Sequence, residues 1–505
     1  MLRIPRHALR TLSLFTLLCP TAAFLLTWVR PVFSVPSVLA LGGALFFYAR
    51  RGAQARLHRE EDVWQCPALL FFAALACAML WTQLSGIGGF FYQNEDHYGR
   101  NAIFHDLLNH SWPVYFEGTP YALTYYINYW ILPSLLGKAA ALLDARLLWP
   151  AANIALYVQT VWFLLLTFLL LFSVLNVKRL WEALLVLFLF VFFSGMDTLL
   201  IAHDNAWNIQ AEWWAELYQY SSHTTCLFWV YNQAVPAWLG VMLLLSRKED
   251  VSSYALLGLS VLPFSPLPFV GLFVYFLLLA LAALVHRARM QGLRAGVTAF
   301  AGECFSAQNL LAILAILPSF YFYFSANQAS NQAPFRLELF TYAFTPITIF
   351  LRLLLFALVE FGAFALVLGS RYRKEPLFLF TCVLLLLCPL FRVGFNGDFS
   401  MRASIPGLTV LCVYAQRFLL EALHEKRRRY AAGVLALLLS VGAFTPLLEF
   451  ERGAYKVRQA GTLFLSSDPF GTVLHPQADT FNFICEDVST SVFYRYFAMK
   501  GANPP

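Results

Sequence analysis

Long apolar runs separated by short polar connections make up the chain as far as about residue 448. A helix needs ~20 mostly apolar residues to cross the hydrocarbon core of a bilayer. By this length rule, the pattern predicts about thirteen spanning helices. The expected spans are 10–29, 31–49, 66–84, 150–174, 183–202, 227–245, 254–268, 269–285, 308–325, 345–369, 375–391, 404–423 and 430–448.

Basic residues gather in alternate connections between the expected spans, and these connections all lie on one side of the membrane. The clusters are Arg3/Arg6/Arg10, Arg50/Arg51/Arg56/Arg59, Lys178/Arg179, Arg247/Lys248, Arg287/Arg289/Arg294, Arg371/Arg373/Lys374 and Lys426 to Arg429. Cytoplasmic loops carry an excess of Lys and Arg, so this side is expected to be cytoplasmic. Residues 1–30 resemble a signal peptide, but no small-residue cleavage site precedes the next apolar run. We therefore expect a retained first span and a cytoplasmic N-terminus.

The remaining connections are expected to face outward, and they hold most of the other polar residues. They are 85–149, 203–226, 326–344 and 392–403, followed by the tail 449–505. The predicted organisation is a transmembrane domain over 1–448 and a small extracytoplasmic tail over 449–505. The tail is mixed in polarity and could form a lid or cap.

Composition supports lipid as the main solvent of this chain. Of its 505 residues, 60% are hydrophobic and only 12% are charged, whereas soluble domains carry about 25% charged residues. The net charge of +7 is modest and lies in the loop clusters, which indicates membrane orientation and no nucleic-acid partner. The nine Cys include no CxxC pair, and Cys485 alone is expected to be exposed.

The first outer loop begins with Glu95, Asp96, His97 and Arg100 close together. Acids before a helix can be ordinary solvated capping residues. Here the acids directly follow a span, close to the lipid headgroups, where a charged residue often has a functional role. Adjacent acids also repel, which can raise the pKa of one of them toward a value useful to a general base.

Two helices are expected to follow these acids in the same loop. Ala102–Asn109 has apolar residues at helical spacing and predicts an amphipathic helix along the interface. Tyr121–Leu143 is apolar and aromatic, is interrupted by Pro133 and carries Lys138, which favours a second interfacial or re-entrant helix. If it spanned the membrane instead, the orientation of every later basic loop would be inverted.

The second outer region combines acids and histidines with many aromatic residues. Asp197 lies near the outer end of a span, and His203 and Glu212 follow it. The aromatic residues could form an interfacial belt or stack on sugar rings. The His and acidic residues could supply ligands to a divalent metal, but no HExxH or comparable spacing indicates such a site.

The fourth outer loop contains Asp398 and Arg402, four residues apart. They could pair with each other, or Arg402 could face a phosphate, because a guanidinium matches phosphate oxygens bidentately. Arg352 and Glu360 lie inside an expected span, where they could form a buried pair or line a cavity. The chain has no GxxxxGK[ST] loop, no GxGxxG after a strand and no Asp-x-Asp pair, so a nucleotide-dependent reaction is not supported.

This layout resembles the multi-spanning glycosyltransferases of the GT-C fold class. Those enzymes use polyprenyl-phosphate-linked sugars, act on the extracytoplasmic side, and carry one or two acids in the first large outer loop ahead of two interfacial helices. The motifs NEDHYGRNAIFHDLLNHSWPV, TYYINYWILPSLLGK and NGDFSMRASIP also resemble an incompletely characterised bacterial group related to that class. The layout differs in two respects. The acidic loop follows the third expected span, whereas in the class it follows the first, and the tail is shorter than the globular C-terminal domains of many such enzymes.

The resemblance implies an all-α, GT-C-like enzyme in the bacterial cytoplasmic membrane. Its partners would be membrane lipid, a polyprenyl-phosphate sugar and a glycan, lipid or protein acceptor. Asp96 would be the catalytic base, with Glu95 as its neighbour and stand-in. The expected donor-binding and orienting residues are Arg402 first, then His97, Arg100, Lys138, Arg392, Asp398, Asp197, His203 and Glu212.

Two other functions remain open from the sequence. A transporter or flippase of lipid-linked glycans would use charges inside the membrane, such as Arg352, Glu360 and Asp197. An O-antigen-ligase-like enzyme would share the lipid-linked donor but would rely more on Arg and His than on an acid. No metal is assigned. The sequence identifies neither the sugar nor the acceptor.

Overall fold

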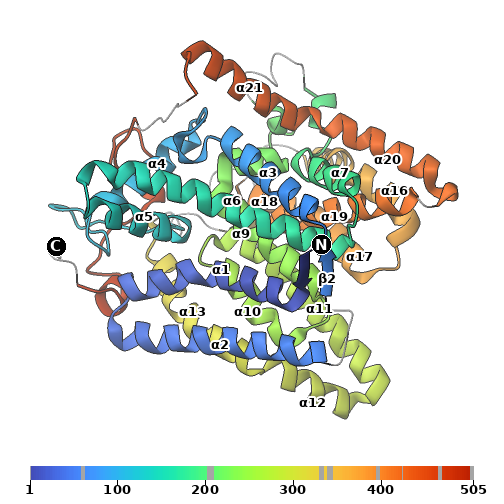
Figure 1. Ribbon diagram of the computed structural model, residues 1–505, viewed down its shortest axis with the longest axis horizontal. Helices are drawn as coiled ribbons and strands as arrows, with labels where there is room; N and C mark the ends of the chain where they lie inside the picture. Colours follow the sequence, from blue (N-terminus) through green and yellow to red (C-terminus); the bar gives the residue numbers. More distant parts are fainter. Residues whose placement is uncertain are drawn as a thin grey trace.

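A computed structural model describes residues 2–57, 63–201, 210–328, 335–337, 345–393, 398–423, 425–463 and 469–500. These residues are mainly helical, as predicted, and three short strand pairs connect distant segments. The helices that frame the molecule are α1 (Arg6–Trp28), α2 (Pro31–Leu57), α3 (Ala68–Leu84), α6 (Leu148–Leu175), α7 (Leu180–Val191), α9 (His223–Ser246), α10 (Tyr254–Val261), α11 (Pro266–Gln291), α12 (Leu293–Cys304), α13 (Ala307–Ser325), α15 (Pro346–Ala357), α16 (Ala363–Tyr372), α17 (Pro376–Leu387), α19 (Ile405–Ala422), α20 (Arg429–Gly442) and α21 (Phe444–Ala460) (Figure 1).

Among the described residues, 8 helices are long and apolar enough to cross a membrane. Four shorter apolar helices accompany them, at Ala68–Leu84, Leu180–Val191, Val251–Val261 and Pro376–Leu390. The chain thus has the helices of a multi-pass membrane protein, whereas the total of about thirteen spans stays a prediction from length. Two expected spans are shorter than predicted, because α7 ends at Val191 and α10 ends at Val261.

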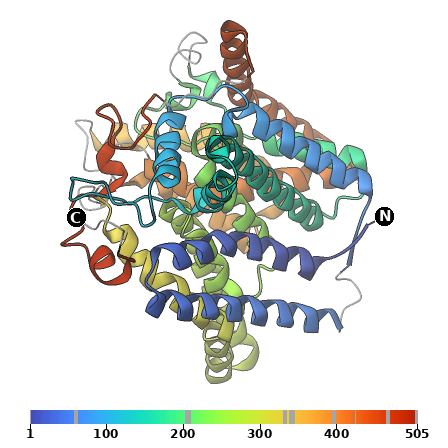
Figure 2. The same ribbon diagram turned by 60° about the vertical axis from the view of Figure 1, so that its left-hand side comes forward.

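The two ends of the bundle are distinguished by contacts between distant segments. At one end, strand β1 (Leu2–Pro5) pairs antiparallel with β2 (Val63–Cys66), which lies between α2 and α3. At the other end, the turn between α1 and α2 contacts the C-terminal tail, where Arg30 Nε donates to the Ala498 carbonyl at 2.8 Å. Figure 2 shows the two termini at opposite ends of the molecule.

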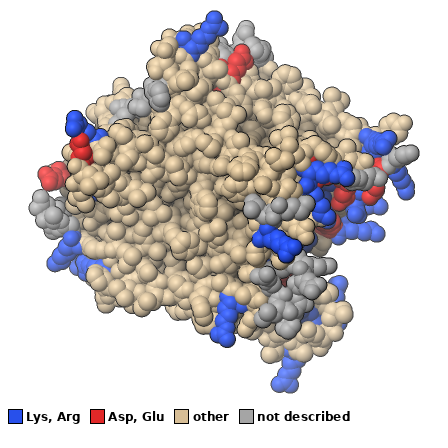
Figure 3. Space-filling model, viewed as in Figure 1, with Lys and Arg blue, Asp and Glu red and all other residues tan. Residues whose placement is uncertain are grey.

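The surface is consistent with a lipid environment. The face in Figure 3 has a broad central band without charged side chains, and Lys and Arg gather toward its right-hand edge. Large apolar side chains are exposed along the peripheral helices, including Leu39 on α2 and Leu366 on α16. A soluble protein rarely exposes apolar surface on this scale.

The acidic loop is followed by α4 (Asp96–Asn109) and α5 (Asn128–Ala141), which confirms two helices in this loop. Both are 14 residues long, and neither is among the described helices that could cross a membrane by length and composition. They lie on the side of the molecule where the C-terminus is found (Figure 1). The position of α4 and α5 at the membrane interface stays a prediction from the sequence.

The tail contributes more to this end than the sequence indicates. Strand β6 (Ile484–Cys485) pairs antiparallel with β3 (Ala122–Leu123) ahead of α5. Cys485 is therefore buried, and the expectation that it is exposed was wrong. The buried Asp106 of α4 accepts a hydrogen bond from the backbone N–H of Val473 at 2.9 Å. These contacts bury faces of α4 that a free interfacial helix would leave in solvent.

Candidate functional site

The acidic loop is attached to a break in helix α9. Val230 has non-helical dihedral angles inside α9, and Pro236 lacks the N–H that would bond to the residue four positions earlier. At this break the Phe228 carbonyl accepts hydrogen bonds from Asn94 Nδ2 at 2.9 Å and from His97 Nε2 at 3.1 Å. The interrupted helix thus provides a backbone acceptor that fixes the start of α4.

Asp96 and Arg100 form an ion pair across one turn of α4. The distance from Arg100 Nη2 to Asp96 Oδ2 is 3.0 Å, and 43% of the Asp96 side chain is exposed against 8% for Arg100. Arg100 also reaches α9, with Nε 3.5 Å from Asn232 Oδ1 and its guanidinium 5.9 Å from the centre of the Tyr231 ring. A buried cation therefore holds an accessible carboxylate at the surface, and Glu95 is exposed beside it.

His97 is directed into the protein, away from the exposed acids. It is only 1% exposed, and its ring stacks on Tyr231 at 5.6 Å. Burial, followed by the nearby charge of Arg100, lowers the pKa of His97 to about 3. The imidazole is therefore neutral at physiological pH, and its contacts position the loop.

Asp398 and Arg402 form an ion pair on the short helix α18 (Asp398–Ala403), as one of the two sequence interpretations predicted. The Arg402 side chain is mostly buried, and Asp398 is about half exposed. Among the described residues, Arg402 Nε is buried without a hydrogen-bond partner. The guanidinium therefore retains a donor that its carboxylate partner does not use.

The two ion pairs lie near one tyrosine. Burial raises the pKa of Tyr125, and the charges of Arg100, Arg402, Asp96 and Asp398 all act on its hydroxyl. Tyr125 comes directly before α5 in the first outer loop, so this residue connects the first loop with the fourth. The structure thereby brings together two groups of predicted site residues that are about 300 positions apart in the sequence.

The second outer region contributes two buried carboxylates. Asp197 is fully buried and accepts from Ser194 Oγ at 3.1 Å and from Thr445 Oγ1 at 2.9 Å. Glu212 Oε1 accepts from the backbone N–H of Ser222 at 2.8 Å. Burial, followed by the charge of Asp197, raises the pKa of Glu212 to about 8. These acids are enclosed by protein, unlike the exposed pair Glu95 and Asp96.

Glu360 joins this second group, whereas a buried pair with Arg352 was one of the two possibilities that the sequence left open. Arg352 Nη1 pairs instead with Glu216 Oε2 at 3.1 Å. Glu360 lies on η9 (Leu358–Gly362), a π-helical segment between α15 and α16, and it accepts from Trp214 Nε1 at 2.8 Å. Asp197 is close enough to act electrostatically on the Glu360 carboxylate. This carboxylate lies so close to Gly195 that a Cβ there would collide with it.

Glu212 and Arg402 both act electrostatically on the Cys226 thiol near the start of α9. The second group of acids is therefore adjacent to the fourth outer loop. Asp197, Glu212 and Glu360 form a buried group beside the exposed one, and the two groups differ in their access to solvent.

Of the remaining predicted binding residues, Lys138 lies near the end of α4 opposite the acids, and Arg392 lies on a strand that contacts α18. Lys138 Nζ donates to the His110 carbonyl at 2.5 Å and lies 4.7 Å from the Trp112 ring, so it supports the end of α4. Burial lowers the pKa of Lys138 to about 8. Arg392 lies on strand β5 (Phe391–Val393), which pairs with β4 (Phe335–Leu337). His203 lies outside the described residues.

Helix α21 borders the acidic loop. The sequence did not suggest this contact. Glu449 Oε2 accepts from Trp229 Nε1 at 3.1 Å, and Glu449 Oε1 pairs with Arg452 at 2.8 Å. Arg452 and Glu95 both act on the hydroxyl of Tyr92, just before the acids. The Glu449–Arg452 spacing is compatible with a helical pair, but no local pattern connects it to a loop some 350 residues earlier.

Among the described residues, no group of three or more His, Cys, Asp and Glu side chains is arranged to hold a metal ion. The charged groups of the candidate site are instead the exposed acids Glu95 and Asp96 and the largely buried cations Arg100 and Arg402. No family model, curated protein or solved structure matches this chain.

Proposed function

We propose that this protein is a GT-C-type membrane glycosyltransferase, which moves a sugar from a polyprenyl-phosphate donor to an acceptor hydroxyl outside the cytoplasm. The observation that carries the proposal is that two ion pairs, Asp96–Arg100 and Asp398–Arg402, both lie close enough to Tyr125 to act electrostatically on its hydroxyl. Such a reaction needs an accessible carboxylate to take a proton and a cation to hold a phosphate. This end of the bundle offers both.

Arg402 is the proposed phosphate ligand. Its planar guanidinium matches two phosphate oxygens, and its Nε has no partner among the described residues. Asp398 is about half exposed and can turn toward solvent when a phosphate replaces it. Neutralising the phosphate makes polyprenyl phosphate a better leaving group.

Asp96 is the proposed base. Its carboxylate accepts the proton of the acceptor hydroxyl while the hydroxyl oxygen attacks the anomeric carbon. The bond from that carbon to the phosphate oxygen breaks, and the electron pair leaves with the polyprenyl phosphate. Arg100 holds Asp96 in position, and Glu95 is close enough in the chain to act as a weak substitute.

The proposed location is the bacterial cytoplasmic membrane, with the basic end of the bundle inside the cell. The positive-inside rule supports this orientation, because the Lys and Arg clusters lie in alternate connections between the expected spans and therefore on one side of the membrane. The acidic loop, α4, α5 and the tail would then face outward, together with the acceptor.

Comparative lipidomics of cells with and without the gene tests this function. A polyprenyl-phosphate sugar should accumulate without the gene and return to its normal level when the wild-type gene is restored. The Asp96→Asn variant should not restore it, whereas Asp144→Asn, at an exposed acid between α5 and α6, should. Unchanged lipid-linked sugars in the deletion strain would argue against the proposal.

A second candidate is a transporter or flippase of lipid-linked glycans. It is favoured by Asp197 and Glu360, which are buried together where a π-helical segment interrupts an otherwise α-helical span. Ionisable residues within spans often mark transport pathways. A flippase would move a fluorescent lipid-linked sugar across vesicles without cleaving it, would depend on Glu360, and would tolerate Asp96→Asn.

A further inference from the structure

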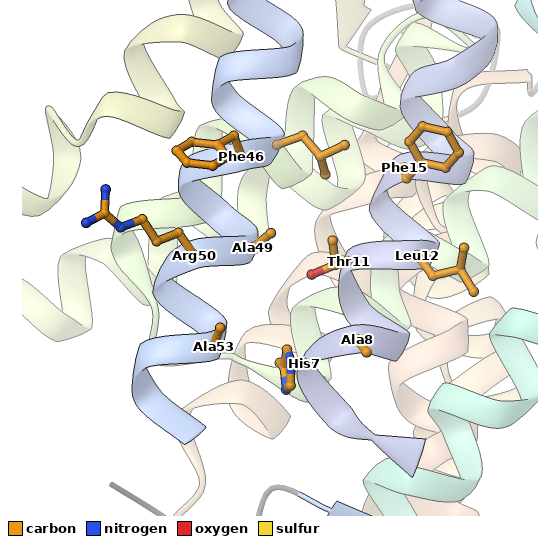
Figure 4. A pocket seen from close by; sticks show the side chains of 10 residues that line it. His7, Ala8, Thr11, Leu12, Phe15, Phe46, Ala49, Arg50 and Ala53 are labelled. Carbon is orange, nitrogen blue, oxygen red and sulfur yellow. The ribbon is translucent and has the colours of Figure 1, made fainter. Parts of the chain in front are cut away.

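A cavity of about 590 Å³ opens between α1 and α2, at the end of the bundle opposite the proposed active site. Figure 4 shows its two walls, with one row of side chains from each helix. The lining residues are His7, Ala8, Thr11, Leu12, Phe15, Leu45, Phe46, Ala49, Arg50 and Ala53. The cavity begins near the N-terminus and follows the first turns of α1 and the last turns of α2.

Its inner part is apolar and accessible from the surrounding lipid. Leu12, Phe15 and Phe46 are 40%, 50% and 58% exposed. Small residues, Ala8 on α1 and Ala49 on α2, leave room between these larger side chains. A single acyl chain fits such a groove, because it needs apolar walls and no hydrogen-bond partners.

Its outer part is basic. Arg50 lines the cavity near the end of the α2 span, and Figure 4 shows its side chain directed away from α1, whereas His7 lies between the two helices. Arg50 is exposed and makes no ion pair with any described residue. Further arginines lie near the same end in sequence, at positions 3, 6 and 51. Basic pockets between helices on the cytoplasmic side bind anionic lipid headgroups.

We propose that this groove binds one anionic glycerophospholipid, with its phosphate at Arg50 and one acyl chain between Leu12 and Phe46. The positive rim selects an anionic headgroup over a zwitterionic one. The site is separate from Asp96 and Arg402, so the proposal holds whether or not the protein transfers sugars.

Native mass spectrometry of the purified full-length protein tests the site, with phosphatidylglycerol and phosphatidylcholine of identical acyl chains as probes. The wild type should retain phosphatidylglycerol in preference to phosphatidylcholine. Arg50→Gln should weaken phosphatidylglycerol retention roughly tenfold, the equivalent of one lost charge-assisted contact. Arg51→Gln is the matched control, because Arg51 is adjacent and exposed but does not line the cavity.

Ala49→Phe distinguishes acyl-chain binding in the apolar part of the groove from headgroup binding at Arg50. A phenyl ring at position 49 should fill the groove and reduce retention of both lipids, whereas Arg50→Gln should affect only the anionic one. Equal retention of the two lipids by the wild type would overturn the proposal, as would equal effects of Arg50→Gln and Arg51→Gln. A dimer that Ala49→Phe dissociates would show instead that a second copy of the chain occupies the groove.

Discussion

His97→Gln should make the protein less sensitive to acid. The wild-type imidazole is buried and neutral, and it is attached to the break in α9 through the Phe228 carbonyl. Protonation would place a second positive charge beside Arg100 in a buried site. Glutamine retains an N–H donor but does not titrate, so the substitution removes the proton-linked cost while keeping a group that can bond to the carbonyl.

The magnitude follows from proton linkage. Burial, followed by the Arg100 charge, lowers the pKa of His97 from 6.5 to about 3, so the unfolded chain binds more protons than the folded one between these values. The contribution of His97 to stability is fully present above pH 6.5 and is lost as pH falls toward 3. The loss amounts to about 2 kcal/mol at pH 5 and about 3 kcal/mol at pH 4.

Denaturant titration of the reconstituted protein at pH 7.5 and pH 5, followed by tryptophan fluorescence, measures this difference. Between the two conditions, the wild type should lose about 2 kcal/mol more than His97→Gln. His105→Gln is the control, because it removes an imidazole from the same helix without affecting the contact to Phe228. Equal losses in the wild type and His97→Gln would refute the buried, neutral assignment of His97.

Asp106→Ala should destabilise the attachment of the tail by about 1–3 kcal/mol, since it leaves the buried N–H of Val473 without an acceptor; faster proteolysis of the tail would report it. Arg402→Lys should raise KM for a polyprenyl-phosphate sugar about tenfold with little change in thermal stability, because lysine keeps the charge but loses the guanidinium fork. Glu360→Gln should be tolerated in thermal unfolding, because the amide can still accept from Trp214 and can donate toward Asp197. Glu360→Ala should cost about 1 kcal/mol because it removes the hydrogen-bond acceptor of the partly buried Trp214 N–H.

Each of these expectations has an outcome that would contradict it. Unchanged proteolysis of Asp106→Ala would show that the tail is held by other contacts. An unchanged KM in Arg402→Lys would remove the guanidinium from donor recognition. Similar unfolding of the Gln and Ala variants at Glu360 would mean that its hydrogen bonds contribute little.

The sequence predicted the helical membrane character because apolar runs of this length have few alternatives in water. The two helices after Asp96 were also predictable, from apolar spacing in one and from aromatic composition in the other. The Asp398–Arg402 pair follows from the four-residue spacing, which places both side chains on one face of a helix. All these features depend on neighbours within a few turns of chain.

The contacts that assemble the site are long-range, and no local pattern shows them. A pair between Glu360 and Arg352 was one of two possibilities because the two share a span, yet the hydrogen-bond partner of Glu360, Trp214, comes from a different outer region. The burial of Cys485 depends on pairing with a strand more than 350 residues earlier. The break in α9 that accepts the acidic loop lies at Val230, and no local pattern in the sequence marks that position.

The most direct test of the proposed function is a transfer assay with the purified protein in lipid nanodiscs. A panel of polyprenyl-phosphate sugars, each radiolabelled in the sugar, would be supplied with a membrane extract as the source of acceptor. The account predicts release of unlabelled polyprenyl phosphate and appearance of a labelled product with the wild type. Asp96→Asn should lower the rate at least a hundredfold while the protein stays folded, because the amide oxygen of asparagine can still accept a hydrogen bond from Arg100. Undiminished transfer by the folded Asp96→Asn protein would contradict the central claim.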